Sequence, residues 1–298
     1  MANVSKNTYM QERDIEKVTT KQKIGKTIVT IVIYTFLTIV ALSVLFPFYW
    51  MLSSSLKEVD EYRANIPTLF PHVLDFHNYV EAFEKANLGR LFLNTLYVGV
   101  VSTVLSLVIT VISAFAFARL EFKGKNILFA ALLATMMIPG ELFTVTNFIT
   151  IYRFKWTSTY IVLIVPFLVS VYYIYLLRQN FLQIPNELYL AAKVDGTSDL
   201  KYLWKVMIPL SLPTLITITI LKMMGAWNSY MWPRLVANDT AHTLITNGLR
   251  NAYQTADQST DYPVQMAAVA IVSIPLFLVF ILLRKYIMKG VSRSGIKG

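Results

Sequence analysis

Long apolar runs separated by short charged segments dominate the chain. The runs with few or no charges cover residues 27–52, 91–118, 126–152, 156–177, 206–232 and 262–283. A bilayer core about 30 Å thick needs roughly 20 apolar residues in a helix, whereas a strand of a membrane barrel needs about 10 residues of alternating character. Runs of this length therefore predict an all-α membrane protein with six transmembrane helices.

Polar residues interrupt two of these runs. Pro139-Gly140-Glu141 divides the third run, so we expect its helix to end near Ile138. Lys222 is the charged residue inside the fifth run. A lysine within a span costs roughly 2.5–3.5 kcal/mol on insertion scales and usually faces a cavity or a partner. Lys222 is therefore a candidate for a functional position.

The first apolar run is read as a retained helix and not as a signal peptide. It follows 26 mostly polar residues, is too long for a signal-peptide core and precedes no A-x-A-like cleavage site. The predicted order of segments is a cytoplasmic segment (1–26), the first transmembrane helix (27–56), an extracytoplasmic segment (57–90), a core with helices 2–6 (91–289) and a cytoplasmic tail (290–298).

The distribution of Lys and Arg predicts the orientation. With the N-terminus inside, 18 of the 27 basic residues lie on the cytoplasmic side, in residues 1–26, 119–125, 178–205 and after residue 283. Eight lie in the opposite loops, and Lys222 lies within a span. Cytoplasmic loops carry the excess of positive charge. Both termini are therefore expected in the cytoplasm.

Composition narrows the function classes further. The chain is 55% apolar and 15% charged, where a soluble domain carries about 25% charged residues. Its net charge of +10 follows from the topology and does not indicate nucleic-acid binding. The absence of cysteine excludes disulfides, thiolate metal sites and cysteine nucleophiles, and the three histidines form no HExxH pattern.

Gly25-Lys26-Thr27 is the one triplet that suggests ATP binding by this chain. A P-loop requires a glycine five residues before Gly25, where this chain has Thr20. The triplet also precedes a transmembrane helix instead of following a strand. We therefore expect no ATP hydrolysis by this chain.

The most informative segment is the polar loop between the fourth and fifth runs, over residues 183–206. Its first half predicts a short helix that Asn186 can cap, with Glu187 in the first turn, where a negative charge suits the helix dipole. Asp195-Gly196 then ends the helix, since glycine readily adopts the left-handed conformation common at helix C-termini.

The second half of this loop predicts another short amphipathic helix. Thr197 or Ser198 caps it, and apolar residues recur at helical spacing, among them Trp204. Two such helices joined by a glycine favour docking into another protein. A helix pair lying on the lipid headgroups is the alternative.

These residues resemble the loop of ABC importer permeases, whose pattern is Glu-Ala-Ala-x-x-Asp-Gly-Ala followed by two prolines. The matching positions are Ala191, Ala192, Asp195, Gly196, Pro209 and Pro213. Leu190 stands where the family has its glutamate, and Thr197 where it has alanine. The family glutamate pairs electrostatically with the ATPase, so Leu190 weakens the charge part of the resemblance and leaves the docking shape intact.

The resemblance extends along nearly the whole chain. The further similar segments are residues 74–79 with Phe83, residues 114–124, residues 136–139, Trp227-Asn228 with Trp232-Pro233, and the glycine-punctuated residues 290–298. All resemble carbohydrate-type permeases that act as the second of two unlike subunits. The chain is thus similar to the transmembrane domain of a binding-protein-dependent, maltose-type ABC importer.

This resemblance implies the following function and partners. The chain would move a sugar or oligosaccharide across a prokaryotic cell membrane by alternating access. It would pair with a homologous second permease, two cytosolic ATPase subunits that bind ATP and Mg, and an extracytoplasmic solute-binding protein; the chain itself would hold no cofactor or metal. The ATPase-docking residues would be Glu187, Leu190, Ala191, Ala192, Asp195, Gly196, Thr197, Trp204 and Pro209.

The candidate substrate pathway centres on the fifth run and comprises Lys222, Trp227, Asn228 and Glu141. Two structural alternatives exist for Lys222: its ammonium could reach the outer headgroups, or it could pair with Glu141. Trp227, Tyr230 and Trp232 also fit the aromatic belt of a membrane interface.

Other function classes are less consistent with the sequence. A secondary transporter would carry ionisable residues in several spans, where this chain offers Lys222 and Glu141. A membrane enzyme would need paired carboxylates, histidines or a nucleophile–base set, and none is evident. The closest rival is an ABC permease for a peptide, an amino acid or phosphate.

Overall fold

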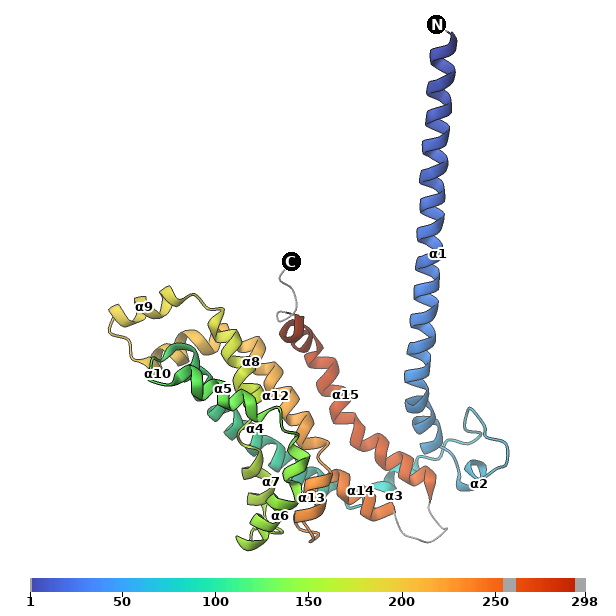
Figure 1. Cartoon of the computed structure of the whole chain (residues 1–298). Helices are drawn as coiled ribbons and strands as arrows, with labels where there is room; N and C mark the ends of the chain where they lie inside the picture. Colours follow the sequence, from blue (N-terminus) through green and yellow to red (C-terminus); the bar gives the residue numbers. More distant parts are fainter. Residues whose placement is uncertain (1, 254–260, 293–298) are drawn as a thin grey trace. The chain divides into compact units, whose positions relative to one another are not determined.

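The computed structural model describes the backbone of residues 2–253 and 261–292, and side chains within residues 25–253 and 261–285 (Figure 1). It divides into two compact units, residues 1–75 and 76–298. Residues 293–298 of the expected tail lie outside the described part. The described residues contain helices and no strand, which confirms the predicted all-α class.

The first unit contains α1 (Ala2–Ser55) and α2 (Val59–Tyr62). α1 continues through the expected cytoplasmic segment as one helix of 54 residues. The segment after it folds back on the helix end: Lys57 is 1% exposed, donates to the Thr68 carbonyl and lies 4.6 Å from the Trp50 ring centroid. This buried ammonium ties the chain after α1 to a fixed path.

Glu61 fixes the same return segment. Its carboxylate accepts hydrogen bonds from Thr68 Oγ1 at 2.5 Å and from the His72 backbone N–H at 3.0 Å. Burial works against ionisation, but these hydrogen bonds and the nearby charges of His72 and Lys57 outweigh it and lower the pKa of Glu61.

The second unit is a bundle of helices around α4 (Leu88–Arg119), which packs against α8 (Val171–Leu182) and α12 (Leu212–Trp227) (Figure 1). The face of α4 that enters these contacts is small and polar and includes Gly99, Ser102 and Ser106. A Cβ at Gly99 would lie 3.2 Å from the Met223 sulfur. Small residues therefore let α4 and α12 approach closely.

The remaining elements of the second unit complete three apolar clusters around α4. They are α3 (His77–Lys85), α5 (Lys125–Thr135), η1 (Gly140–Phe143), α6 (Thr144–Arg153), α7 (Tyr160–Ile164), η2 (Val165–Phe167), α9 (Asn186–Val194), α10 (Asp199–Tyr202), the π-helical turn η3 (Leu203–Met207), α11 (Ile208–Leu210), α13 (Met231–Val236), α14 (Ile245–Tyr253) and α15 (Tyr262–Ser292).

Within the residues that the structure describes, three single helices and three bent helix pairs meet the length and composition of a membrane span. The single helices are Gly25–Ser55, Leu88–Arg119 and Tyr262–Lys285. The bent pairs are Lys125–Thr135 with Gly140–Arg153 (81°), Tyr160–Phe167 with Val171–Leu182 (44°), and Asp199–Leu210 with Leu212–Trp227 (81°). Together they correspond in order to the six predicted runs.

The break in the third span was predicted, whereas the structure corrects the expected course of the fourth and fifth spans. The third helix ends at Thr135, just before the predicted Ile138, and the chain turns at Pro139-Gly140 as expected. The fourth run, expected to be continuous, breaks between Phe167 and Val171, and the fifth helix begins only at Leu212. Hydropathy follows the preference of side chains for an apolar environment and does not register such breaks, because apolar residues continue through them.

Candidate functional site

The loop that carries the family resemblance forms the predicted helix pair. α9 ends at Val194, and Gly196 adopts φ +69°. The Gly196 N–H donates to the Lys193 carbonyl at 3.0 Å and the Thr197 N–H to the Ala192 carbonyl at 2.8 Å, the pair of bonds of a Schellman motif. The predicted glycine stop is confirmed.

The caps of the two helices differ in how well they were predicted. Ser198 Oγ accepts a hydrogen bond from the Lys201 N–H and caps α10, as expected. Asn186, expected to cap α9, is instead its first residue, and Pro185 occupies the cap position. The Asn186 amide oxygen lies 3.5 Å from Arg119 Nη1, so a residue distant in sequence determines its role.

Polar contacts fix α9 against α10. Asp199 accepts a hydrogen bond from the Tyr189 hydroxyl at 2.8 Å and lies 2.7 Å from Lys193 Nζ. The hydrogen bond to Asp199 raises the pKa of Lys193. The Tyr189 ring lies 5.1 Å from that of the buried Tyr202. These contacts hold the two helices at one relative angle.

Arg119, at the end of α4, anchors this pair to the membrane helices. Its side chain is buried, and Nη2 donates to the carbonyls of Phe181 at 3.0 Å and Ile184 at 2.5 Å. These carbonyls lie at the C-terminal end of α8, where a helix leaves acceptors unsatisfied and favours a cation. One guanidinium therefore joins α4, α8 and the start of α9.

The helix pair turns apolar side chains outward. Val194 is 88% exposed and Trp204 67% exposed, and Leu188, Leu190 and Leu200 are also exposed. Among the other predicted docking residues, Ala192 and Thr197 are half-buried; Glu187, Ala191, Asp195, Gly196 and Pro209 are exposed. Several exposed apolar side chains within one short segment are typical of a protein or membrane contact.

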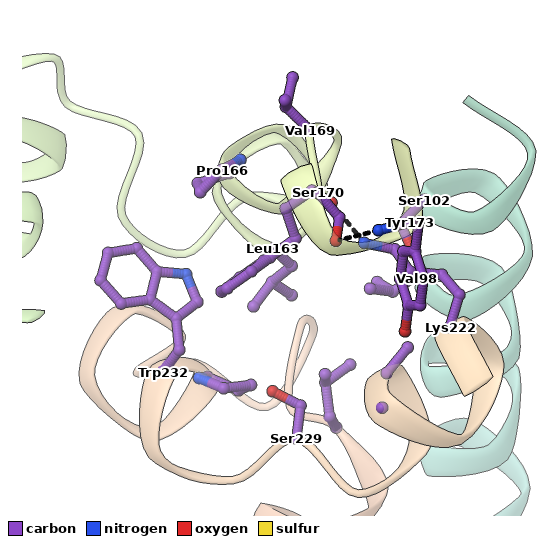
Figure 2. A pocket seen from close by; sticks show the side chains of 15 residues that line it. Val98, Ser102, Leu163, Pro166, Val169, Ser170, Tyr173, Lys222, Ser229 and Trp232 are labelled. Atoms are coloured by element: carbon purple, nitrogen blue, oxygen red, sulfur yellow. Dashed lines mark hydrogen bonds between the residues drawn. The ribbon is translucent and has the colours of Figure 1, made fainter. Parts of the chain in front are cut away.

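A cavity of about 360 Å³ lies where α4, α8, α12 and α13 meet the break between η2 and α8 (Figure 2). Its polar lining residues are Ser102, Ser170, Tyr173, Lys222, Ser229 and Trp232. Figure 2 shows Trp232 on the opposite side of the cavity from Tyr173 and Lys222. Broken helices are where membrane transporters commonly form binding sites.

The side chain of Lys222, in α12, reaches the broken helix formed by α7, η2 and α8. Its ammonium donates a hydrogen bond to the Phe167 carbonyl at the end of η2, an acceptor that the break leaves without its helical partner. In the part of the chain that the structure describes, Lys222 forms no ion pair with Glu141. The contact thus differs from both structural alternatives drawn from the sequence.

The other predicted pathway residues do not join this cavity. Trp227 is buried in an apolar cluster, with its ring 5.6 Å from that of Phe92. Asn228 is exposed and donates to the Met224 carbonyl at 3.0 Å. Glu141 is exposed in η1. Of the four pathway residues, the structure places Lys222 in the cavity lining.

The sequence reasoning missed the contributions of α4 and α8 to this cavity. Ser102 and Tyr173 lie far from Lys222 in sequence and carry no motif; helix packing brings them together. Trp232 was assigned to the interface belt, but its Nε1 donates to the Val162 carbonyl at 3.0 Å. This hydrogen bond fixes the ring against the broken helix.

No cluster of three or more His, Asp or Glu side chains that could hold a metal occurs within the described residues. The fold and the two sites above are those of a membrane transport subunit. They combine helices of spanning length, an exposed helix pair outside the apolar runs and a cavity at a broken helix.

Residues 106–293 match the family described as "Binding-protein-dependent transport system inner membrane component", and the chain belongs to this family. It is 29% identical to the arabinooligosaccharides transport system permease protein AraQ of Halalkalibacterium halodurans, over 87% of this chain and 93% of that protein. It is 30% identical to the melibiose/raffinose/stachyose import permease protein MelC of Bacillus subtilis, over 87% and 94%.

Two further similarities widen the range of relatives. The sn-glycerol-3-phosphate transport system permease protein UgpE of Rhizobium meliloti is 30% identical, over 83% of this chain and 90% of that protein. A solved bacterial ABC transporter involved in the import of the acidic polysaccharide alginate matches with a TM-score of 0.79 and 25% identity, covering 87% of this chain and 96% of that chain. The predicted membrane permease class is confirmed.

Proposed function

We propose that this chain is one permease subunit of an ATP-driven importer that moves a sugar or oligosaccharide from an extracytoplasmic binding protein into the cytoplasm. The observation that carries the proposal is the near-complete alignment with permeases named for oligosaccharide uptake. The family description, a binding-protein-dependent inner membrane component, supports the same role.

The subunit works inside a larger complex. It pairs with a homologous but different permease, and two cytosolic ATPase subunits bind ATP and Mg and hydrolyse the nucleotide. Both termini lie in the cytoplasm, consistent with the Lys and Arg distribution. The α9–α10 pair, which is exposed and fixed to α4 and α8 through Arg119, docks one ATPase subunit and transmits its motion.

Alternating access follows from this arrangement. When ATP holds the ATPase subunits together, the helix pair moves as one body, because its Schellman turn and the Lys193–Asp199 contact fix its angle. The connected α8 and α12 then shift with it and open the outer side.

A non-sugar solute is the second candidate. The similarity to a permease named for sn-glycerol-3-phosphate transport favours a phosphorylated polyol over a peptide or an amino acid. Within the carbohydrates, the names of the relatives cover both oligosaccharides and an acidic polysaccharide.

Uptake by the reconstituted complex tests the proposal. The chain is purified with its co-expressed partner subunits, placed in proteoliposomes and supplied with binding protein and a panel of labelled sugars and peptides. We expect sugar uptake that requires both ATP inside and binding protein outside. Uptake of sugar without ATP, or ATP-dependent uptake of peptides alone, would contradict it.

A further inference from the structure

The cavity beside Lys222 has an unbalanced charge. Lys222 is its one formally charged lining residue, and no carboxylate lines it among the described residues. The other polar groups are hydroxyls and the Trp232 indole, and the rest of the wall is apolar. An ammonium in such surroundings is costly unless a counter-charge or several acceptors surround it.

The contacts of Lys222 leave capacity for a ligand. An ammonium can donate three hydrogen bonds, and within the described residues Lys222 donates one, to the Phe167 carbonyl. That carbonyl is held at the end of η2 because Ser170 begins α8 by accepting from the Tyr173 N–H. The bond therefore positions the ammonium at the cavity wall (Figure 2).

The remaining walls suit a sugar ring. The volume of about 360 Å³ falls in the range of roughly 300–1,000 Å³ of small-molecule sites. Trp232 presents a ring that its hydrogen bond to Val162 fixes in place, and the Ser102, Tyr173 and Ser229 hydroxyls come from three different segments. The site combines one aromatic wall, several hydroxyls and one cation.

We propose that this cavity binds the anionic group of a carboxylated or phosphorylated sugar and that Lys222 is the residue that recognises this charge. The proposal rests on the proposed function, since it specifies the substrate class of the same importer. A neutral sugar would displace water from the ammonium without supplying a counter-charge, whereas a carboxylate or phosphate would form a charge-assisted hydrogen bond in an environment that strengthens it.

Direct binding to the complete complex tests this assignment. The permease pair with its ATPase subunits is placed in nanodiscs without binding protein, so that the selectivity of the binding protein does not enter. The probes are digalacturonate with digalactose of the same linkage as its neutral counterpart, and galactose 6-phosphate with galactose. We expect at least one of the two anionic probes to bind at least about tenfold more tightly than its neutral counterpart. One charge-assisted hydrogen bond supplies an affinity ratio of this size.

Two variants separate charge recognition from the structural role of Lys222. Lys222→Gln keeps a donor for the Phe167 carbonyl and removes the charge; Lys222→Met removes both. We expect Lys222→Gln to fold, to bind the anionic probe about tenfold more weakly and to bind the neutral probe unchanged. Lys155→Gln, the same change at an exposed lysine outside the cavity, should alter neither affinity.

The two probe pairs also distinguish a carboxylate from a phosphate ligand. The pair with the larger ratio of anionic to neutral affinity identifies which group the cavity binds. Equal affinities for anionic and neutral probes in the unmodified complex, or a preference that survives in Lys222→Gln, would overturn the assignment. If the binding test fails in this way while the reconstituted complex imports neutral sugars with ATP and binding protein, the inference about Lys222 is wrong and the proposed function stands. Absence of any ATP-dependent carbohydrate uptake would instead overturn the proposed function.

Discussion

The α9–α10 pair and the Lys222 cavity differ in which side chains they present to a partner: apolar side chains on the helix pair and polar side chains in the cavity. The helix pair exposes apolar side chains such as Val194 and Leu200 and fixes its polar side chains to one another, with Lys193 Nζ 2.7 Å from Asp199. The cavity encloses its polar groups, including Lys222 and Tyr173, among apolar neighbours. One surface is suited to a macromolecule and the other to a small ligand.

The two regions also depend on different kinds of information. The helix pair is local: a glycine with φ +69° and a serine cap define it within about twenty residues of the chain. The cavity draws on segments from Val98 to Leu244. Damage to the loop should therefore uncouple a protein that still folds, whereas damage to the bundle should affect folding or selectivity.

The largest effect is expected from Gly196→Val. A β-branched residue at φ +69° is strained by at least roughly 1–2 kcal/mol, enough to depopulate the turn about tenfold. The two helices then meet at a different angle, so sugar uptake and co-purification of the ATPase should fall by about that factor while membrane insertion is normal.

Gly25→Val is the matched control for Gly196→Val. Gly25 lies within α1, and a Cβ there meets no atom within 4 Å. Its uptake should stay close to that of the unmodified protein. Normal uptake and normal ATPase co-purification by Gly196→Val would refute the role assigned to this turn.

Arg119→Met should act on folding instead of coupling. It removes the donors to the Phe181 and Ile184 carbonyls, and each unsatisfied buried acceptor costs roughly 1–3 kcal/mol. We expect a lower melting temperature and a lower yield of complex, measured by fluorescence-detected gel filtration. Arg153→Met, at an exposed arginine, is the control; equal melting temperatures would exclude the anchoring role.

A cysteine at Asn228 tests the motion that connects the two regions. The chain has no natural cysteine, and Asn228 is exposed just after α12. If the outer side opens when ATP is trapped, an impermeant thiol reagent should label Asn228→Cys several-fold faster in that state. Glu84→Cys, at an exposed position in a different helix, α3, controls for access of the reagent. Equal labelling of Asn228→Cys in both states would argue against alternating access at Asn228.

The smallest effect is expected from Leu190→Glu, which restores the glutamate of the family pattern. Leu190 is exposed, and surface charge pairs contribute about 0–1 kcal/mol, so uptake should change by less than about fivefold. Leu190→Gln removes the apolar side chain without adding charge. Loss of ATPase binding in both variants would show that docking here requires an apolar contact.

The sequence predicted the helical class, the six runs and the turn at Gly196, and missed the bends in the fourth and fifth runs. The break at Pro139-Gly140 was predictable because proline and glycine mark it directly. The break between Phe167 and Val171 was missed because apolar residues continue through it, although Pro166 and the Ser170 cap of α8 lie beside it.

The predicted pathway residues show the same limit. Lys222 was found because a charge within an apolar run is rare and costly. Asn228 was predicted from its proximity to Lys222 in sequence, and Trp227 as an aromatic residue near the end of the same run. The structure instead places Trp227 in an apolar cluster and Asn228 at the surface. Ser102 and Tyr173 join Lys222 through packing alone.

The sequence by itself determined what local chemistry and the bilayer dictate: helices where apolar residues run for about twenty positions, a left-handed turn at Gly196, and one charge that needs a partner. The tertiary structure decided which partner that charge has, where the helices break and which hydroxyls face it. Hydrogen bonds such as those from Arg119 to Ile184 and from Lys222 to Phe167 join segments distant in the chain. Such contacts depend on how helices pack against one another, and periodicity along one segment contains no information on its neighbours.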